Sequence, residues 1–473
     1  MTTRYRNELS LEMPMSKSLS FKTVEMLDAA AIRKFSAGLT GHVIMPNDGL
    51  YESARWGWNR AIDRHPGMIV RCTTTEDVVR AVDFARNNDL LLAVRSGGHS
   101  FAGHSNCDGG MVIDFSAMRG IHVDPSSRVA RAQAGVKVGE FDCATQSVGL
   151  ATVMGGCEDV GIGGLTLGGG QGLLSGCYGL ACDNLLSVEV VTVDGRLLNA
   201  SAREHEDLFW GIRGGAGNFG VATLLEYRLH PVKQIFGGAV VYPIESLKQV
   251  LRCWRDYSSD PADELTTVFG ISTMPSGPAI GIVGGWCGDL DQGQTALRPL
   301  TSFGSPLMSS LRGLSYLDFQ HSIEEFNPTQ VSAHRKSNFF KQLTDESIDV
   351  IAEHIRRAAG SFFLGVFPYR GAICRVGASA TAFPIRERGY DVWIDAYWQQ
   401  PSEAEPSREW TNHFWNAMRP FTTGAVYVNN LSDEGEERAR AAFGANYDRL
   451  VALKNKYDPT NFFRMNQNIK PTV

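Results

Sequence analysis

The stretch 155–172 constrains the fold of this chain more than any other, because nine of its eighteen residues are glycine. Glycine loses more backbone entropy on ordering than any other residue, so a run this dense is a poor helix interior and a poor strand. Proteins keep such runs where a turn needs positive φ or where the backbone lies directly against a ligand. A flexible linker is the alternative, but Val160, Ile162, Leu165 and Leu167 make the run too apolar for one.

The length of 473 residues predicts two or three domains. Charged residues make up 20% of the chain and hydrophobic residues 43%, which is typical of a globular protein. The net charge of -6 argues against a nucleic-acid partner and against binding to an anionic membrane surface. No apolar stretch is long enough to cross a bilayer, so we expect no membrane-spanning segment.

The nine cysteines have no regular spacing, which indicates thiols in a reducing compartment rather than a disulfide framework. The N-terminal residues contain no apolar run of signal-peptide length. We therefore expect a cytoplasmic protein. Because the sequence has no C-x-x-C, no H-E-x-x-H and no cysteine-histidine cluster of zinc spacing, we expect no metal site.

The N-terminal half alternates short strand and helix patterns after a polar arm with one short helix. A strand is predicted at 68–72, then a helix with Thr74 or Thr75 as its cap, then a second strand at 90–94. The second strand leads into Ser-Gly-Gly-His-Ser at 96–100. Converging backbone N–H groups and two hydroxyls in such a turn can cradle a phosphate. Taken alone, the histidine of this turn is more often structural than functional.

A second glycine cluster, Arg-Gly-Gly-Ala-Gly-Asn-Phe-Gly-Val, occupies 213–221. It follows a β-branched strand pattern at 187–193 and the turn Asp194-Gly195, which together predict a hairpin. Two glycine clusters separated by a hairpin indicate that several backbone segments converge on one extended ligand.

After about Pro231 glycine becomes less frequent, and the pattern changes to that of a sheet covered by helices. Strands are predicted at 238–242, 279–286, 362–366 and 392–398, and helices at 244–257, 346–358 and 407–418. A single helix at 436–456 precedes a tail at 457–469 that is too rich in asparagines and aromatic residues for a disordered C-terminus.

Five motifs occur in a fixed order along the chain. They are Arg-Ser-Gly-Gly-His-Ser (95–100), Gly-x-Cys-x-x-Val-Gly-x-Gly-Gly (155–164), Gly-Gly-Gly-x-Gly (168–172), Asp-Leu-Phe-Trp-x-x-Arg-Gly-Gly-x-Gly-Asn-Phe-Gly-Val (207–221) and Tyr-Asp-Pro-x-Asn-x-Phe-x-x-Asn-Gln-Asn-Ile (457–469). Together they resemble the berberine-bridge-enzyme-like FAD-linked oxidases, which have the vanillyl-alcohol-oxidase/PCMH-type FAD-binding fold. Within that family the match is to the branch with a bicovalent flavin.

The resemblance implies an α+β fold of two domains. One is a PCMH-type FAD-binding domain, and the other is an α/β substrate domain with an antiparallel sheet covered by helices. It implies an N-terminal arm at 1–40, the N-terminal part of the FAD-binding domain at 41–230 and a substrate-binding domain at 231–430. A C-terminal segment at 431–473 would complete the FAD-binding domain. Nothing in the sequence indicates an oligomeric state.

The resemblance also implies two covalent bonds to FAD, from His99 to the flavin 8α-methyl group and from Cys157 to flavin C6. A neutral imidazole and a thiolate are good nucleophiles toward an oxidised flavin. The alternative for Cys157 is a small buried hydrophobe. Further residues implied at the FAD site are Arg95, Ser96, Gly97, Gly98, Ser100, Val160, Gly161, Gly163, Gly164, Gly168, Gly169, Gly170, Tyr178, Asp183, Asn184, Gly220, Val221, Asn466 and Asn468.

Val160 stands where the family's oxygen-reactive members tend to carry valine, which favours O2 as the electron acceptor. The implied function is oxidation of an alcohol or hemiacetal C–OH, or of an activated C–H, in a carbohydrate or secondary metabolite. A hydride would pass to flavin N5, and O2 would be reduced to H2O2. The alternatives are a flavin dehydrogenase with another acceptor and a flavin-binding protein without turnover.

Candidate catalytic residues come from two segments. Tyr427 matches the tyrosine of the family's Tyr-x-Asn strand, which is the base in sugar- and alcohol-oxidising members. Because an unperturbed tyrosine titrates near pH 10, a base role requires a cation or the flavin environment to lower its pKa. At 390–398, period-two alternation places Asp391, Trp393, Asp395 and Tyr397 on one face of a strand. Asp395 and Tyr397 are the expected partners of Tyr427, although a structural role suits each equally well.

Overall fold

The computed structural model describes residues 21–324, 328, 331–358 and 360–473. A first sheet has the strand order β1 (His42–Ile44), β2 (Met68–Arg71), β4 (Met111–Asp114) and β3 (Leu92–Arg95), with β2 and β3 parallel to β4. The predicted helix between β2 and β3 is α3 (Thr75–Asn87), and its N-cap Thr74 forms a capping box with Asp77. Before this sheet lies α1 (Ala29–Ala37), the predicted short helix, and between β1 and β2 lies α2 (Tyr51–Arg55). The first twenty residues of the predicted arm lie outside the described residues.

A second sheet is antiparallel and has the order β5 (Ile121–Asp124), β6 (Val129–Gln133), β10 (Val221–Arg228), β8 (Leu185–Val191) and β9 (Leu197–Ser201). The predicted hairpin turn joins β8 to β9, and Gly195 adopts φ +78 there. Three further elements accompany this sheet: α4 (Val138–Gln146), α7 (Glu206–Ile212), and the short pair of β7 (Leu150–Ala151) with β11 (His230–Pro231).

The glycine run contains a helix, which corrects the expectation drawn from its composition. α5 (Ile162–Leu167) begins within the run and includes Gly163 and Gly164, and α6 (Ser175–Tyr178) follows it. Tertiary contacts offset the poor helix propensity: the Ile162 N–H donates to the Val136 carbonyl, and the Leu167 carbonyl accepts from Gly214 and Ala216. The last two bonds tie the first glycine cluster to the second.

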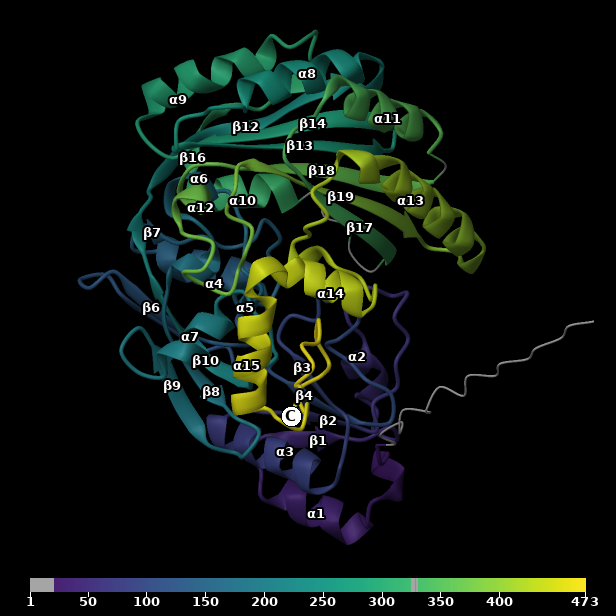
Figure 1. Cartoon of the computed structure of the whole chain (residues 1–473). Helices are drawn as coiled ribbons and strands as arrows, with labels where there is room; N and C mark the ends of the chain where they lie inside the picture. The colour runs from purple at the N-terminus through teal and green to yellow at the C-terminus, as the bar shows by residue number, and fades with distance from the viewer. Residues whose placement is uncertain (1–20, 325–327, 329–330, 359) are drawn as a thin grey trace, which may run out of the picture.

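The third sheet has eight strands and confirms the predicted antiparallel sheet. Its order is β15 (Met308–Ser309), β12 (Gln234–Pro243), β14 (Gly277–Trp286), β13 (Leu265–Met274), β18 (Ser361–Tyr369), β19 (Gly389–Trp398) and β17 (Ser332–Phe340), with β16 (Arg312–Ser315) also paired to β12. The sequence patterns missed β13 and β17. One face is covered by α8 (Leu247–Tyr257), α9 (Leu290–Leu297), α11 (Asp345–Arg356) and α13 (Ala404–Met418) (Figure 1). The α+β class is therefore confirmed.

Two predictions in the C-terminal part are wrong. The expected single helix at 436–456 is two helices, α14 (Glu436–Phe443) and α15 (Tyr447–Tyr457). The chain turns between them at Gly444, whose φ of +50 suits glycine. Tyr427 does not lie in a strand, because a 3-10 turn (Val428–Asn430) begins directly after it. α15 packs back against α7 of the N-terminal half (Figure 1).

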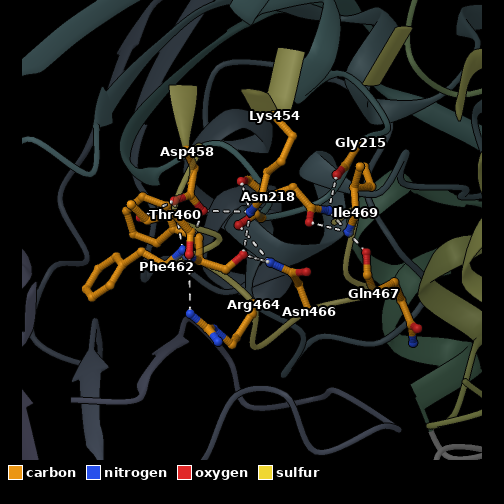
Figure 2. Close-up of polar contacts among 12 residues, drawn as sticks. Gly215, Asn218, Lys454, Asp458, Thr460, Phe462, Arg464, Asn466, Gln467 and Ile469 are labelled. Atoms are coloured by element: carbon orange, nitrogen blue, oxygen red, sulfur yellow. Dashed lines mark hydrogen bonds and ion pairs between the residues drawn. The ribbon is translucent and has the colours of Figure 1, made fainter. Parts of the chain in front are cut away.

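A buried ion pair fixes the C-terminal tail to the second glycine cluster (Figure 2). Lys454 Nζ lies 2.7 Å from Asp458 Oδ2, and neither side chain is exposed. Lys454 also donates to the carbonyls of Asn218 and Phe463, each at 2.8 Å. Asn466 donates to the carbonyl of Gly217 at 3.1 Å. The asparagine-rich tail thus serves tertiary packing, as its composition indicated. Among the described residues, no helix is long and apolar enough to cross a membrane.

Candidate active site

One cavity of about 550 Å³ lies between the glycine clusters and the face of the eight-stranded sheet that is turned away from α8, α9, α11 and α13. Both clusters line it, as predicted. Alternation along the strands decides which sheet residues face it: Gly270 and Ser272 line the cavity, whereas Phe269 and Ile271 pack under the helices. Of the residues predicted from the sequence, the cavity is lined by Ser96, Gly97, Gly98, His99, Ser100, Cys157, Val160, Gly161, Gly163, Gly164, Gly220, Val221, Asn466, Tyr427, Asp395 and Tyr397.

The two glycine clusters and the 96–100 turn form one wall of the cavity, the backbone wall. Its glycines are required for two different reasons. A Cβ added at Gly97 or Gly161 would overlap the other loop, because the two backbones touch. An added Cβ at Gly164 or Gly217 meets no atom within 4 Å, although both residues line the cavity. The protein alone therefore does not require glycine at the second pair. Room for a ligand against the backbone explains it.

FAD fits this wall. Its phosphates and ribityl chain need backbone approach and polar donors, which the open glycines and Ser96–Ser100 turn supply. Asn466 also lines the cavity, and its Oδ1 is buried without a hydrogen-bond partner among the described residues. A buried polar atom without a partner is costly in a folded protein, so a bound ligand is the physical explanation for it.

His99 is held as a neutral imidazole. Its ring stacks on Trp58, with 5.6 Å between the ring centroids. Burial lowers the pKa of His99 to about 4, and the Asp159 carboxylate only partly opposes this effect. A nitrogen lone pair is therefore available at neutral pH. Trp58 was missed from the sequence, where it lies outside every motif.

Cys157 is a protonated thiol in the described structure. Its Sγ lies 3.8 Å from Oε1 of Glu324, at the end of α10 (Tyr316–Glu324). Burial raises the pKa of Cys157 to about 12, and the Glu324 carboxylate adds to this effect. The thiol therefore cannot act as a nucleophile at neutral pH unless a base takes its proton.

The sheet wall carries a buried ion pair that the sequence did not reveal. Arg335, on β17, donates to both carboxylate oxygens of Asp395 at 2.6 Å. Its third donor reaches Asn430 Oδ1 at 2.8 Å, and its guanidinium lies 3.7 Å from the Phe101 ring centroid. Tyr397 donates to Asp395 Oδ2 at 2.9 Å. Arg335 lies on β17, a strand that no sequence pattern predicted, so its position on the sheet was not foreseen.

Tyr427 lines the cavity from beside the glycine run. Its Oη accepts hydrogen bonds from the Gly170 N–H and from Asn429 Nδ2, each at 2.8 Å. Burial raises the pKa of Tyr427 well above its ordinary value, although the two donors work in the opposite direction. Tyr427 is therefore a neutral phenol here, and no cation appears among the described groups that shift its pKa.

A second buried carboxylate lies behind this wall. Asp391 accepts hydrogen bonds from Asn430 at 2.7 Å, from Ser337 at 3.1 Å and from Gln171 at 3.2 Å. Burial raises the pKa of Asp391 to about 6 despite these donors. Gln171 and Asn430 line the cavity, whereas Asp391 does not, so Asp391 orients the polar side chains of the wall.

The remaining predicted site residues do not line the cavity. Gly168, Gly169 and Gly170 pack beneath Tyr427 and Asn429, and they position those side chains. Arg95 forms an ion pair with Asp114 at 3.4 Å under the Ser96 turn.

The other predicted residues outside the cavity act in turns and packing. Asp183 binds Arg386 through two contacts of 2.7 Å. Asn184 caps the preceding turn through the Tyr178 and Leu180 carbonyls, and Tyr178 stacks on His230 with ring centroids 3.8 Å apart. The Oδ1 of Asn468 is buried and has no partner among the described residues, but Asn468 also lies away from the cavity lining.

Comparison with known proteins agrees with the resemblance found in the five motifs. The family model for an FAD binding domain matches residues 66–201, and the berberine and berberine-like model matches residues 426–470. An FAD-linked oxidoreductase of Dictyostelium discoideum is 30% identical over 446 residues, which cover 93% of this chain and 97% of the relative. The (R)-6-hydroxynicotine oxidase of Paenarthrobacter nicotinovorans is 29% identical over 454 residues, covering 92% and 97%.

Solved structures agree in fold. The 6-hydroxy-D-nicotine oxidase of Arthrobacter nicotinovorans has a TM-score of 0.83 at 27% identity, over 91% of this chain and 98% of that one. The carbohydrate oxidase of Microdochium nivale has a TM-score of 0.85 at 23% identity, over 94% and 100%. This chain binds FAD and belongs to the berberine bridge enzyme-like family of FAD-linked oxidoreductases.

Proposed function

We propose that this protein is an oxidase that holds FAD through His99 and Cys157, oxidises a C–OH or activated C–H group, and passes the electrons to O2 to give H2O2. The observation that carries the proposal is that His99 and Cys157 line the same cavity as Tyr427 and the Arg335–Asp395 pair. Two nucleophilic side chains and a polar sheet wall then enclose the same ligand. Bound FAD would supply the acceptor for the hydride and the reaction with O2.

The chain's own residues divide into two tasks. The backbone wall binds and orients the cofactor, because it presents backbone N–H donors and open space. The sheet wall holds the substrate against it, with Arg335 fixed by Asp395 and flanked by the Phe101 ring. Val160 lines the cavity beside Cys157, where a small side chain leaves room for O2. This placement favours an oxidase over a dehydrogenase.

Tyr427 is the proposed acceptor of the substrate's hydroxyl proton. The Gly170 and Asn429 donors fix its oxygen at the cavity wall and stabilise a phenolate relative to one without donors. Burial outweighs them in the described structure, so the base role requires that bound cofactor or substrate lower the tyrosine pKa. Asp395 is unsuited to the same task, because Arg335 binds both of its oxygens.

The substrate class follows from the chemistry of the sheet wall. On the sheet, Trp393 and Phe363 offer aromatic faces and Tyr397 offers a hydroxyl, and Gln171 and Asn429 add polar groups from adjoining segments of the cavity. This combination suits a sugar ring or a hydroxylated aromatic metabolite. Relatives named as a carbohydrate oxidase and a hydroxynicotine oxidase lie in the same two classes.

Covalent attachment is tested on the denatured protein. We expect the flavin to remain after acid precipitation and to appear by mass spectrometry on both the His99 and the Cys157 peptides. The Cys157→Ala variant should retain a singly attached flavin with a changed visible spectrum, and His99→Ala should retain flavin only on the Cys157 peptide. Release of all flavin by acid would refute the covalent proposal.

The electron acceptor and the substrate are tested on the holoenzyme. An anaerobic screen of sugars, alcohols and hydroxylated aromatics should identify compounds that bleach the flavin. Stopped-flow mixing of the reduced enzyme with O2 should restore the oxidised spectrum and produce H2O2. Reduction by a substrate without reoxidation by O2 would identify a dehydrogenase instead. A flavin that no compound bleaches would support a protein without turnover.

The Tyr427→Phe variant tests the proton acceptor. General base catalysis contributes roughly 100-fold or more, so flavin reduction should slow by that factor. Both covalent bonds should still form, because the ring remains and neither His99 nor Cys157 contacts Tyr427 among the described hydrogen bonds. An unchanged rate of flavin reduction would remove Tyr427 from the mechanism.

A further inference from the structure

The Cys157 thiol has a carboxylate neighbour from a distant part of the chain. Glu324 ends the described part of α10, between β16 and β17, whereas Cys157 lies in the glycine run. Glu324 Oε1 lies 3.8 Å from Cys157 Sγ. Its other oxygen accepts the backbone N–H of Glu158 at 3.0 Å. The loop that carries the thiol therefore holds one carboxylate oxygen and directs the other toward the sulfur.

The thiol needs such a group. Only a thiolate attacks carbon efficiently, and burial raises the pKa of Cys157 to about 12. At neutral pH the sulfur therefore keeps its proton, and attack on a flavin carbon requires that the proton leave at the same time. His99, the other attachment residue, has no such requirement because its imidazole is already neutral.

We propose that Glu324 is the general base that takes the Cys157 thiol proton while the sulfur bonds to flavin C6. The inference rests on the proposed bicovalent attachment and adds a role to a residue outside the five motifs. Glu324 acts on the reacting sulfur during maturation of the enzyme and has no part in substrate turnover.

The S–H bond breaks, its proton passes to Glu324 Oε1, and the sulfur lone pair forms the S–C6 bond. The hydrogen already on C6 leaves as a proton, and the electron pair of that C–H bond remains in the flavin, which is thereby reduced by two electrons. Two protons, one of them returned by Glu324, accompany those electrons. Dioxygen is the oxidant: it takes the two electrons and two protons as H2O2 and leaves the oxidised, twice-attached flavin.

Two other acidic residues near Cys157 pair with basic side chains. Glu158 contacts His321 at 3.0 Å, and Asp159 forms an ion pair with Lys137 at 2.5 Å. Glu158 and Asp159 directly follow Cys157 in sequence, but neither side chain forms a hydrogen bond with its sulfur among the described residues. Among the described residues, the charged or titratable groups around the thiol and Glu324 include Glu158, Asp159, His321, Lys137 and His99.

The first test compares Glu324→Gln with Glu158→Gln in protein isolated early and late in expression. Both changes remove one carboxylate beside Cys157, and glutamine at 324 still accepts the Glu158 N–H. We expect Glu324→Gln to accumulate flavin attached through His99 alone, with the Cys157 bond forming roughly 100-fold more slowly. Glu158→Gln should match the wild type. Peptide mass spectrometry reads the occupancy of each site.

The second test uses the singly attached Glu324→Gln protein itself, incubated in air at a series of pH values. Without its base, the sulfur must react through its spontaneous thiolate. Formation of the Cys157 bond should then accelerate about tenfold per pH unit between about pH 7 and about pH 9. Added formate should speed the same step in Glu324→Ala by supplying a free carboxylate. A role confined to folding would give no rescue by formate, and the wild type would then show the same dependence on pH as the variant.

The outcomes separate the two proposals. Wild-type flavin that never bonds to Cys157 would overturn the bicovalent function and this inference together. If the wild type forms both bonds and Glu324→Gln forms the Cys157 bond equally fast, only the role of Glu324 as a base is overturned. The same conclusion follows if Glu324→Gln and Glu158→Gln slow that bond equally. Slow attachment that neither high pH nor formate accelerates would also overturn it, because the carboxylate would then act only through packing.

Discussion

The two walls of the cavity are built in opposite ways. The wall from the N-terminal half is backbone: Gly97 and Gly161 touch each other, and Gly164 and Gly217 leave open space. The wall from the sheet is side chains: a buried Arg335–Asp395 pair and Tyr397, with Asp391 hydrogen-bonded behind them. A backbone surface offers a fixed set of donors and suits an invariant ligand such as the cofactor. A side-chain surface can change residue by residue, which suits the substrate.

The largest effect should come from breaking the ion pair of the sheet wall. Asp395 is fully buried, and Asp395→Ala leaves the Arg335 guanidinium without its carboxylate. Removal of one partner from a buried pair costs about 3–5 kcal/mol, so the thermal midpoint should fall sharply. The double variant Arg335→Leu/Asp395→Leu is the control and should lose less stability than the single variant. If the double variant is less stable than the single variant, the attraction between Arg335 and Asp395 exceeds the cost of removing both charges from water.

The backbone wall should show a contrast between two neighbouring glycines. In Gly161→Ala the new methyl group overlaps Ser96 and the Gly97 backbone, so the folded yield should fall, with a cost of about 3 kcal/mol. In Gly164→Ala the methyl group meets no protein atom, and alanine favours the helix α5. That variant should fold normally but contain less flavin, as measured by absorbance per protein. Full flavin content in Gly164→Ala would show that the cofactor lies away from this residue.

A smaller effect on the free energy of unfolding should come from Asp142, which lies behind the backbone wall, as the pH changes. Asp142 is buried, accepts from Gln320, and has its pKa raised to about 7 by burial. The folded protein therefore binds the proton of the Asp142 carboxyl more tightly than the unfolded chain does. The contribution of this protonation to the free energy of unfolding is complete at acid pH and is lost as the pH rises toward 7. Relative to Asp142→Asn, the wild type should lose about 2 kcal/mol between about pH 5 and about pH 7. Parallel unfolding curves for the two proteins would contradict the raised pKa.

The sequence predicted the backbone wall better than the sheet wall, and the residues show why. The capped helix after Thr74, the hairpin at Gly195 and the cavity-lining glycines depend on local backbone preferences, which short patterns report. The period-two pattern also placed Trp393, Asp395 and Tyr397 correctly on the cavity face. Local patterns misjudged α5 and the break at Gly444, where tertiary contacts or a single turn outweigh propensity.

By itself, the sequence determined the family, the α+β fold and the binding of FAD, and it predicted the glycine surface that lines the cavity. Only the tertiary structure decided which side chains meet across the chain. Trp58 reaches His99, Glu324 reaches Cys157, and Arg335 reaches Asp395. The partners in the last two pairs are separated by 167 and 60 residues. Such pairs depend on strand register and helix placement, and no short-range preference of either partner encodes them.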